Sequence, residues 1–187
     1  MRKLKLHMDM TVDGFVAGPQ GEQDWLTGWW GEDEGQPLLS WEYDFTDASD
    51  TILLGRKAAE DFSSYWEGVK ADSPEYPFAR RMVDTPKVVF SRTLGSHPGK
   101  NVRVENGPLV EAVNQLKEQA GKDIIAYGGA TLVASLLENG LIDELNFLVS
   151  PVALGQGMRI FSGRTPLRLQ SSTAYSNGVV VNTYTPG

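Results

Sequence analysis

One pattern occurs twice in the chain, as Thr51-Ile52-Leu53-Leu54-Gly55-Arg56-Lys57 and as Asp123-Ile124-Ile125-Ala126-Tyr127-Gly128-Gly129. Each stretch begins with an apolar run typical of a buried strand, passes through a glycine turn and opens a segment with helical spacing. Glycine lets a backbone approach a ligand closely, and a helix N-terminus presents free N–H groups with partial positive charge. Two such turns beside one sheet can hold two parts of a phosphate-bearing ligand. The pattern therefore predicts a nucleotide cofactor site.

Strands and helices alternate along the rest of the chain. A long loop over 19–36 separates the first strand from the first helix, and Asn177-Gly178 is a strong hairpin signal near the end. This order predicts a single α/β domain over residues 1–187, with a mostly parallel sheet and an antiparallel C-terminal hairpin. The expected strands are 4–10, 51–54, 86–90, 101–104, 123–127, 144–150, 166–169 and 179–184, and the expected helices are 37–47, 58–65, 78–82, 109–120 and 130–138.

Composition excludes several classes of site. The 187 residues include 41% apolar residues, enough for one sizeable core, and no cysteine, which excludes disulfides and thiolate chemistry. With His7 and His97 as the two histidines, we expect no metal site. The net charge of −7 argues against nucleic-acid binding, and no apolar run is long enough for a membrane span. We expect a cytoplasmic protein whose partner is a small-molecule substrate.

A third strand end resembles the two glycine turns in its position. Ser91 and Arg92 directly follow the expected strand 86–90, and ligands of open α/β sheets bind at the carboxyl ends of strands. Arg92, with Arg56 or Lys57, is suited to a ribose 2′-phosphate, which favours NADP over NAD. The alternative stays open that the glycines are ordinary turn residues and the arginines face solvent, because no G-x-G-x-x-G fingerprint is present.

Taken together, these motifs resemble the dihydrofolate reductase-like superfamily, in particular the group akin to the reductase domain of riboflavin biosynthesis. The resemblance covers nearly the whole chain, and its landmarks in order are 11–18, 24–26, 52–57, 88–92, 124–132 and 141–157. It implies a three-layer α/β/α fold of the dihydrofolate reductase type and NADPH as the cofactor.

The resemblance also implies which residues hold NADPH. They are Gly55, Arg56 and Lys57 at the phosphates, Ser91 and Arg92 at the adenosine and 2′-phosphate, and Gly128 and Gly129 with Ala130, Thr131 and Leu132 beneath the pyrophosphate. One departure is Ala58, which stands where the family usually has a threonine. We expect this loss of a hydroxyl to weaken cofactor binding without abolishing it.

On the substrate side, the resemblance places Asp9, Thr11, Asp13 and Ala17 around the nicotinamide, with Trp25 on a covering loop. Asp9 and Asp13 are the candidate catalytic carboxyls. Asp9 lies on the strand face opposite the apolar residues and is expected to point into a cleft. Asp13 fits a turn-capping aspartate beside Gly14 equally well.

Two further features of the substrate side leave alternatives open. The tryptophans at 25, 29, 30 and 41 form either an aromatic wall that stacks on a flat heterocycle or part of the core. A dihydrofolate reductase has a carboxylic acid on its first helix, and neither Glu42 nor Asp44 falls clearly at that position. Dihydrofolate is therefore a less favoured substrate.

The leading hypothesis is an NADPH-dependent reductase of a small, flat heterocycle, resembling 5-amino-6-(5-phosphoribosylamino)uracil reductase of riboflavin biosynthesis. The alternatives are a dihydrofolate reductase or a non-catalytic nucleotide-binding protein with a regulatory or interaction role, an alternative that Ala58 keeps open. We also expect a homodimer, because the terminal hairpin and the run 144–149 supply β-rich, partly apolar surface at a sheet edge that needs covering.

Overall fold

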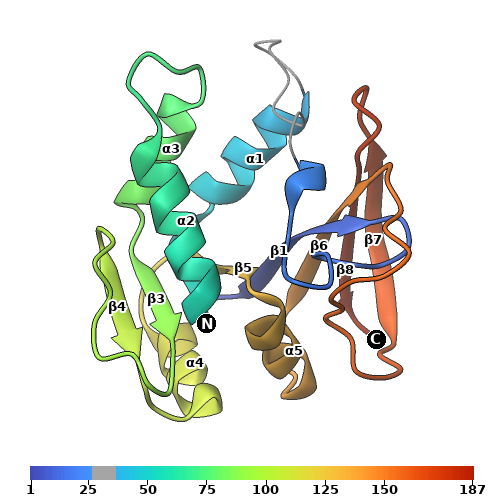
Figure 1. Ribbon diagram of the computed structural model, residues 1–187. Coiled ribbons are helices and arrows are strands. Elements are labelled where there is room, and N and C mark those ends of the chain that lie inside the picture. The colour runs from blue at the N-terminus through green and yellow to red at the C-terminus, as the bar shows by residue number, and fades with distance from the viewer. Residues whose placement is uncertain (27–36) are drawn as a thin grey trace.

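The computed structural model describes residues 1–26 and 37–187 (Figure 1). Its helices are α1 (Pro37–Asp47), α2 (Arg56–Gly68), α3 (Tyr76–Asp84), α4 (Leu109–Glu118) and α5 (Ala130–Glu138), with a short 3-10 helix, η1 (Asp24–Leu26). Its strands are β1 (Leu4–Thr11), β2 (Ser49–Gly55), β3 (Lys87–Phe90), β4 (Val102–Glu105), β5 (Asp123–Gly128), β6 (Glu144–Ser150), β7 (Leu167–Ala174) and β8 (Val180–Pro186).

All strands join one sheet in the order β4-β3-β2-β5-β1-β6-β8-β7. The strands from β4 to β6 are parallel to one another, and β8 is antiparallel to both of its neighbours. The helices lie in two layers, with α1, α2 and α3 in one and α4 and α5 in the other (Figure 1). The predicted three-layer α/β/α fold with an antiparallel C-terminal hairpin is confirmed.

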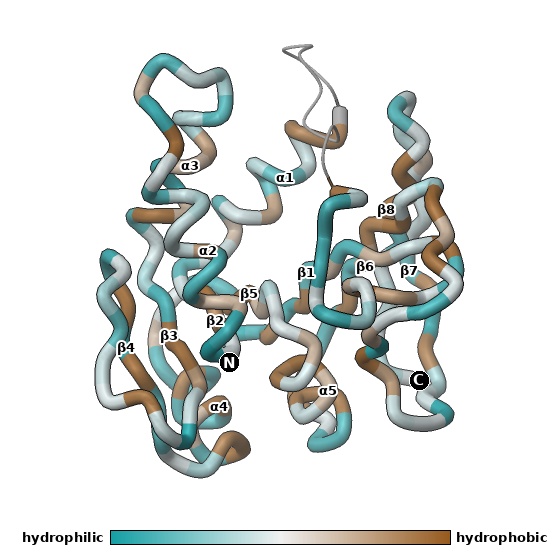
Figure 2. The backbone as a smooth tube through the Cα atoms, in the orientation of Figure 1, coloured by the Kyte–Doolittle hydropathy of each residue, from teal (hydrophilic) through white to brown (hydrophobic). Residues whose placement is uncertain are grey.

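Alternation along β1 explains how the layers form. Leu4, Leu6 and Met8 are buried in one core with residues of α4 and α5 such as Val113 and Leu136. The odd-numbered residues of β1 point to the opposite face, because successive side chains of a strand alternate. That face is covered by α1 (Figure 2). Figure 2 shows hydrophobic residues along the central strands and hydrophilic residues in the connection between α2 and α3.

The expectation that the run 144–149 lies at a sheet edge is wrong. These residues belong to β6, which pairs with β1 on one side and with β8 on the other. The edge strand on this side of the sheet is β7, whose residues after Leu167 are all exposed. The hydrophobic character of β6 therefore reflects an interior strand, since Leu145 and Phe147 are buried.

The order of connections places a topological switch point between β2 and β5, and we call the region at the carboxyl ends of these strands the crevice. These strands are neighbours, yet the chain leaves β2 through α2 and α3 toward β3, and leaves β5 through α5 toward β6 on the far side of β1. Ligands of open α/β sheets bind at such switch points, outside the carboxyl ends of the strands.

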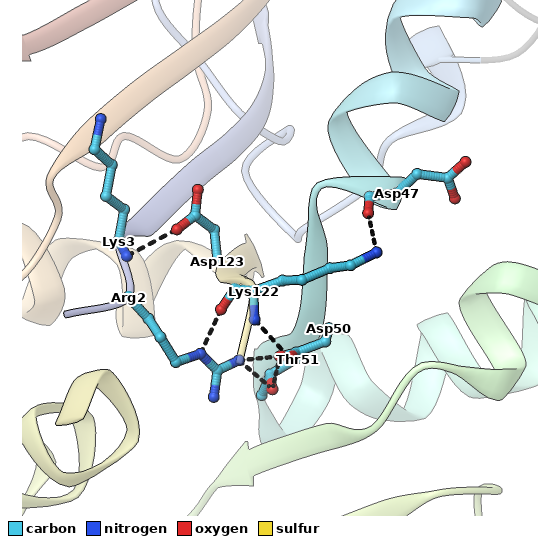
Figure 3. A network of polar contacts seen from close by, with 7 residues as sticks. All are labelled: Arg2, Lys3, Asp47, Asp50, Thr51, Lys122 and Asp123. Carbon is cyan, nitrogen blue, oxygen red and sulfur yellow. Dashed lines mark hydrogen bonds and ion pairs between the residues drawn. The ribbon is translucent and has the colours of Figure 1, made fainter. Parts of the chain in front are cut away.

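The opposite end of the same strands is tied together by polar contacts (Figure 3). The Arg2 guanidinium binds Asp50 and donates a 2.8 Å hydrogen bond to the Thr51 hydroxyl. The backbone N–H of Lys122 donates to Asp50 at 2.8 Å. These contacts join the starts of β1, β2 and β5, and so hold the strands whose far ends form the crevice.

Candidate cofactor and substrate site

The two glycine turns meet in the crevice. Leu54 pairs with Gly128 across β2 and β5. A Cβ added to Gly55 would lie 3.4 Å from the backbone nitrogen of Gly129 and 3.5 Å from Cβ of Leu132. Gly128 has a φ of +132°, a conformation that side chains rarely allow, and the bond between Gly128 and Gly129 is cis. The paired strands thus bring together two turns that are distant in the sequence.

The N-termini of α2 and α5 open into this crevice without side-chain caps. Their N-caps are Gly55 and Gly129, and neither helix has a side-chain hydrogen bond at its N-cap. A Cβ on Gly129 would lie 3.5 Å from Cβ of Ala58, so Ala58 faces the second turn across the crevice. The first N–H groups of each helix have no partner within the helix, and two such ends side by side favour an anion.

Exposed basic residues follow the ends of β2 and β3. Arg56, Lys57 and Arg92 are exposed, and within residues 1–26 and 37–187 no ion pair is formed by Arg56 or Arg92. Gly55 is in register with Phe90, so the chain leaves these neighbouring strands at the same level toward Arg56 and Ser91.

Ser91 and Lys57 also have local partners. The Ser91 hydroxyl accepts hydrogen bonds from the backbone N–H groups of Thr93 (3.3 Å) and Leu94 (3.0 Å), which shapes the loop that carries Arg92. The Lys57 ammonium donates to the backbone carbonyl of Gln20 at 3.5 Å. Lys57 therefore contacts the loop before η1 across the mouth of the crevice.

The Asp13 carboxylate links two loops through hydrogen bonds. Its carboxylate accepts a hydrogen bond from the Thr11 hydroxyl at 2.6 Å and from the backbone N–H groups of Leu154 and Gly155, the latter at 2.7 Å. The Thr11 bond and then the Gly155 bond hold the pKa of Asp13 below its usual range. Asp13 thus fastens the turn after β1 to the loop after β6, and its oxygens are already engaged.

The other residues predicted around the nicotinamide lie in the same group of loops. Ala17 forms an isolated antiparallel bridge with Met158. Trp25 is partly buried on η1, and Trp41 packs its ring on Phe45 of α1 with centroids 4.9 Å apart. Trp29 and Trp30 lie outside the described residues.

His7 and Glu42 form a buried pair on the face of β1 opposite Leu4, Leu6 and Met8. Nε2 of His7 donates to both carboxylate oxygens of Glu42, at 2.8 and 2.9 Å, and the two residues are 5% and 4% exposed. Burial by itself lowers the pKa of His7, but the charge and hydrogen bond of Glu42 outweigh this and leave the pKa raised. Nδ1 of His7 has no hydrogen-bond partner among the described residues.

Asp9 and Tyr127 adjoin this pair. Asp9 is two residues from His7 on the same face of β1, and burial, opposed by His7 and reinforced by Glu42, raises its pKa to about 6. The Tyr127 ring centroid lies 4.8 Å from that of His7, and its buried hydroxyl lacks a partner in the part of the chain that the structure describes. Tyr127 occupies an irregularity in the pairing of β5 with β2, and such bulges re-aim side chains next to functional sites.

Sequence reasoning did not find His7, Glu42 or Tyr127 as site residues. A signal was present for Glu42, because it shares one helical stripe with Leu38, Trp41 and Phe45, and a carboxylate on an apolar stripe needs a buried partner. Among the described residues, no group of three or more potential ligand side chains could hold a metal ion, and no helix has the length and apolar character to cross a membrane.

Comparison with known proteins identifies the family of this chain. The sequence model of the RibD C-terminal domain matches residues 2–181. The chain belongs to the RibD C-terminal domain family. It is 33% identical over 186 residues to the uncharacterized protein YyaP of Bacillus subtilis (strain 168), covering 98% of this chain and 94% of that protein. The predicted group, a reductase-like family of the riboflavin pathway, is confirmed.

Solved structures of proteins with low sequence identity to this chain share its fold. A protein of Shewanella sp. PV-4 shares the fold with a TM-score of 0.76 at 21% identity, covering 100% of this chain and 99% of that chain. Dihydrofolate reductase from Enterococcus faecalis, complexed with NADP(H), shares it with a TM-score of 0.60 at 12% identity, covering 99% and 96%. The dihydrofolate reductase-like fold is thereby confirmed.

Proposed function

We propose that this protein is an NADPH-dependent reductase of a small, flat heterocycle, in the reaction class of 5-amino-6-(5-phosphoribosylamino)uracil reductase. The observation that carries the proposal is the crevice in which Gly55 and Gly129 lie between two helix N-termini without side-chain caps. Membership of the RibD C-terminal domain family supports it, as does the fold shared with a dihydrofolate reductase that binds NADP(H).

The residues of the crevice suit a dinucleotide phosphate. Gly55 and Gly129 let the two turns approach each other closely, and the N–H groups of α2 and α5 would hold the pyrophosphate. Arg56 and Arg92, exposed and without ion pairs to described residues, would pair with phosphate charge. When bound, the reduced nicotinamide supplies a hydride.

The other half of the reaction is a proton, and Asp9 is the group best placed to supply it. A pKa of about 6 keeps part of the Asp9 carboxyl protonated near neutral pH, where an ordinary aspartate is ionised. In this proposal Asp9 donates its proton to a substrate atom next to the reduced carbon, directly or through water, and is reprotonated from solvent. Glu42 acts as a positioning residue, because it holds the His7 ring that lies beside Asp9.

The test is a glycine-to-alanine substitution in the crevice. Gly129 has φ −80° and ψ −177°, an extended conformation that alanine adopts, and the new Cβ would make only an ordinary 3.5 Å contact with Ala58. We expect Gly129→Ala to keep the wild-type melting temperature and to raise the Kd for NADPH at least tenfold, measured by isothermal titration calorimetry.

Gly163→Ala is the matched control, because a Cβ at Gly163 meets no atom within 4 Å. It should leave both the melting temperature and the Kd unchanged. A wild-type protein that binds no NADPH, or a folded Gly129→Ala variant that binds it as wild type does, would contradict the proposed cofactor site.

A further inference from the structure

The segment that builds the substrate side is strongly acidic. Its described parts, residues 6–26 and 37–55, contain eight aspartates and glutamates and no lysine or arginine. This stretch supplies most of β1 together with η1 and α1. Of the 17 lysines and arginines in the chain, fourteen follow residue 55, among them Arg56, Lys57 and Arg92. Asp47 and Asp50 pair with Arg81 and Arg2 away from the crevice, and the remaining residues give the two segments opposite charge character.

Inside the substrate side, positive charge is already balanced. His7 is the one residue of the stretch 6–55 that can carry it, and its Nε2 is bound to both oxygens of Glu42. Asp9 adds a second carboxyl on the same face of β1, close enough to interact electrostatically with both His7 and Glu42. The His7, Asp9 and Glu42 group thus has no positive charge left for an anionic ligand.

Three basic side chains, Lys5, Lys57 and Arg159, have partners outside this group. The Lys5 ammonium pairs with Asp123 at 2.9 Å. The Arg159 guanidinium lies over the Phe15 ring, 4.4 Å from its centroid, and Lys57 donates to the Gln20 carbonyl. In the described residues, no lysine or arginine forms an ion pair with Asp9 or Glu42.

Two buried polar atoms at the same place indicate that a ligand belongs there. Nδ1 of His7, a residue only 5% exposed, and the hydroxyl of Tyr127 have no hydrogen-bond partner among the described residues. Buried polar atoms are nearly always paired, so these two atoms are suited to the N–H and C=O groups of a bound ring. The aromatic rings of Trp41, Phe45 and Tyr127 all lie within 6 Å of the His7 ring, centroid to centroid, and suit a flat molecule.

We infer that the substrate is a flat heterocycle without phosphate, neutral or positively charged when it binds. This inference rests on the proposed function and narrows it. A phosphorylated substrate would bring a dianion beside Asp9 and Glu42, and like charges placed together disfavour binding. The phosphates that the protein does accept are those of the cofactor, because Arg56 and Arg92, which form no ion pair with the described residues, lie at the ends of β2 and β3.

The experiment compares substrates that differ only in phosphate. The probes are 5-amino-6-(ribosylamino)uracil, its 5′-phosphate and the neutral dimethyl ester of that phosphate. Binding to the NADP⁺-saturated protein is followed by tryptophan fluorescence, and NADPH oxidation is followed by absorbance. We expect the nucleoside and the neutral ester to bind at least tenfold more tightly than the 5′-phosphate, a preference that narrows as salt rises from 50 to 500 mM because salt screens charge repulsion.

A variant assigns the preference to the acidic group. Glu42→Gln should reduce the discrimination against the 5′-phosphate severalfold, whereas Asp44→Asn, an exposed carboxylate on the same helix, should leave it unchanged. Equal or tighter binding of the 5′-phosphate, or no binding of any of the three probes, would overturn the inference. Absence of NADPH binding would instead overturn the proposed function, and the fluorescence comparison on the protein alone would still decide the substrate class.

Discussion

Replacing Asp9 with asparagine should stabilise the protein while it removes the proposed proton donor. Burial raises the pKa of Asp9 from 3.8 to about 6, so the ionised carboxylate is less favourable in the folded protein than in the unfolded chain. The sign follows from proton binding. Between those two pKa values the folded state binds the proton and the unfolded state does not, so stability falls as pH rises through this range. Asparagine keeps the shape of the side chain and cannot ionise.

The magnitude comes from the size of the shift. Each pKa unit corresponds to about 1.4 kcal/mol, so the ionised Asp9 costs at most about 3 kcal/mol above pH 7. Because Asp9 is only partly buried, we expect about 2 kcal/mol. The wild type still carries about half of this cost at pH 5, so the advantage of Asp9→Asn should grow by about 1 kcal/mol between pH 5 and pH 8.

The assay is urea unfolding of both proteins at several pH values from 5 to 8, with NADPH oxidation measured in parallel. The variant should lose about 10²–10⁴-fold in kcat/KM, the usual contribution of a general acid. Asp44→Asn is the control, since this exposed carboxylate should leave the pH dependence of stability unchanged. A difference between Asp9→Asn and wild type that stays constant from pH 5 to pH 8 would refute the reasoning.

Three further outcomes follow from the same structure. Arg92→Ala should raise the Kd for NADPH at least tenfold and leave that for NADH unchanged, because a charge-assisted hydrogen bond contributes about 1.5–3 kcal/mol; equal wild-type affinity for both cofactors would contradict this. Light scattering should show that the wild type is a homodimer. Leu169→Lys, on the exposed edge strand β7, should convert it to the 20.5 kDa monomer. A wild-type mass of 20.5 kDa at all concentrations would exclude the dimer. Lys87→Met should lower the free energy of unfolding by about 2 kcal/mol in urea titrations, because Lys87 donates to three carbonyls at the end of α3, and an unchanged midpoint would contradict that role.

Local patterns in the sequence predicted most of the elements and the two glycine turns. The strand–glycine–helix units at Gly55 and Gly128 depend on residues that are neighbours in the chain, and parallel strands bring their carboxyl ends to one edge of a sheet. The turn at Asn177-Gly178 likewise predicted the hairpin, and Gly178 has the φ of +86° that such a turn needs. Asp9 was placed on the correct face of β1 by alternation alone.

The substrate side required the tertiary structure, because its residues meet through pairings that no local pattern records. Glu42 reaches His7 only because α1 crosses the face of β1, and Tyr127 joins them because the register of β5 shifts against β2. The contacts of Asp13 with the backbone N–H groups of Leu154 and Gly155 also appear only in the tertiary structure, because these residues are far from Asp13 in the sequence. Strand order decided the rest: β6 is apolar whether it lies inside or at an edge, and only its pairing with both β1 and β8 shows that it lies inside.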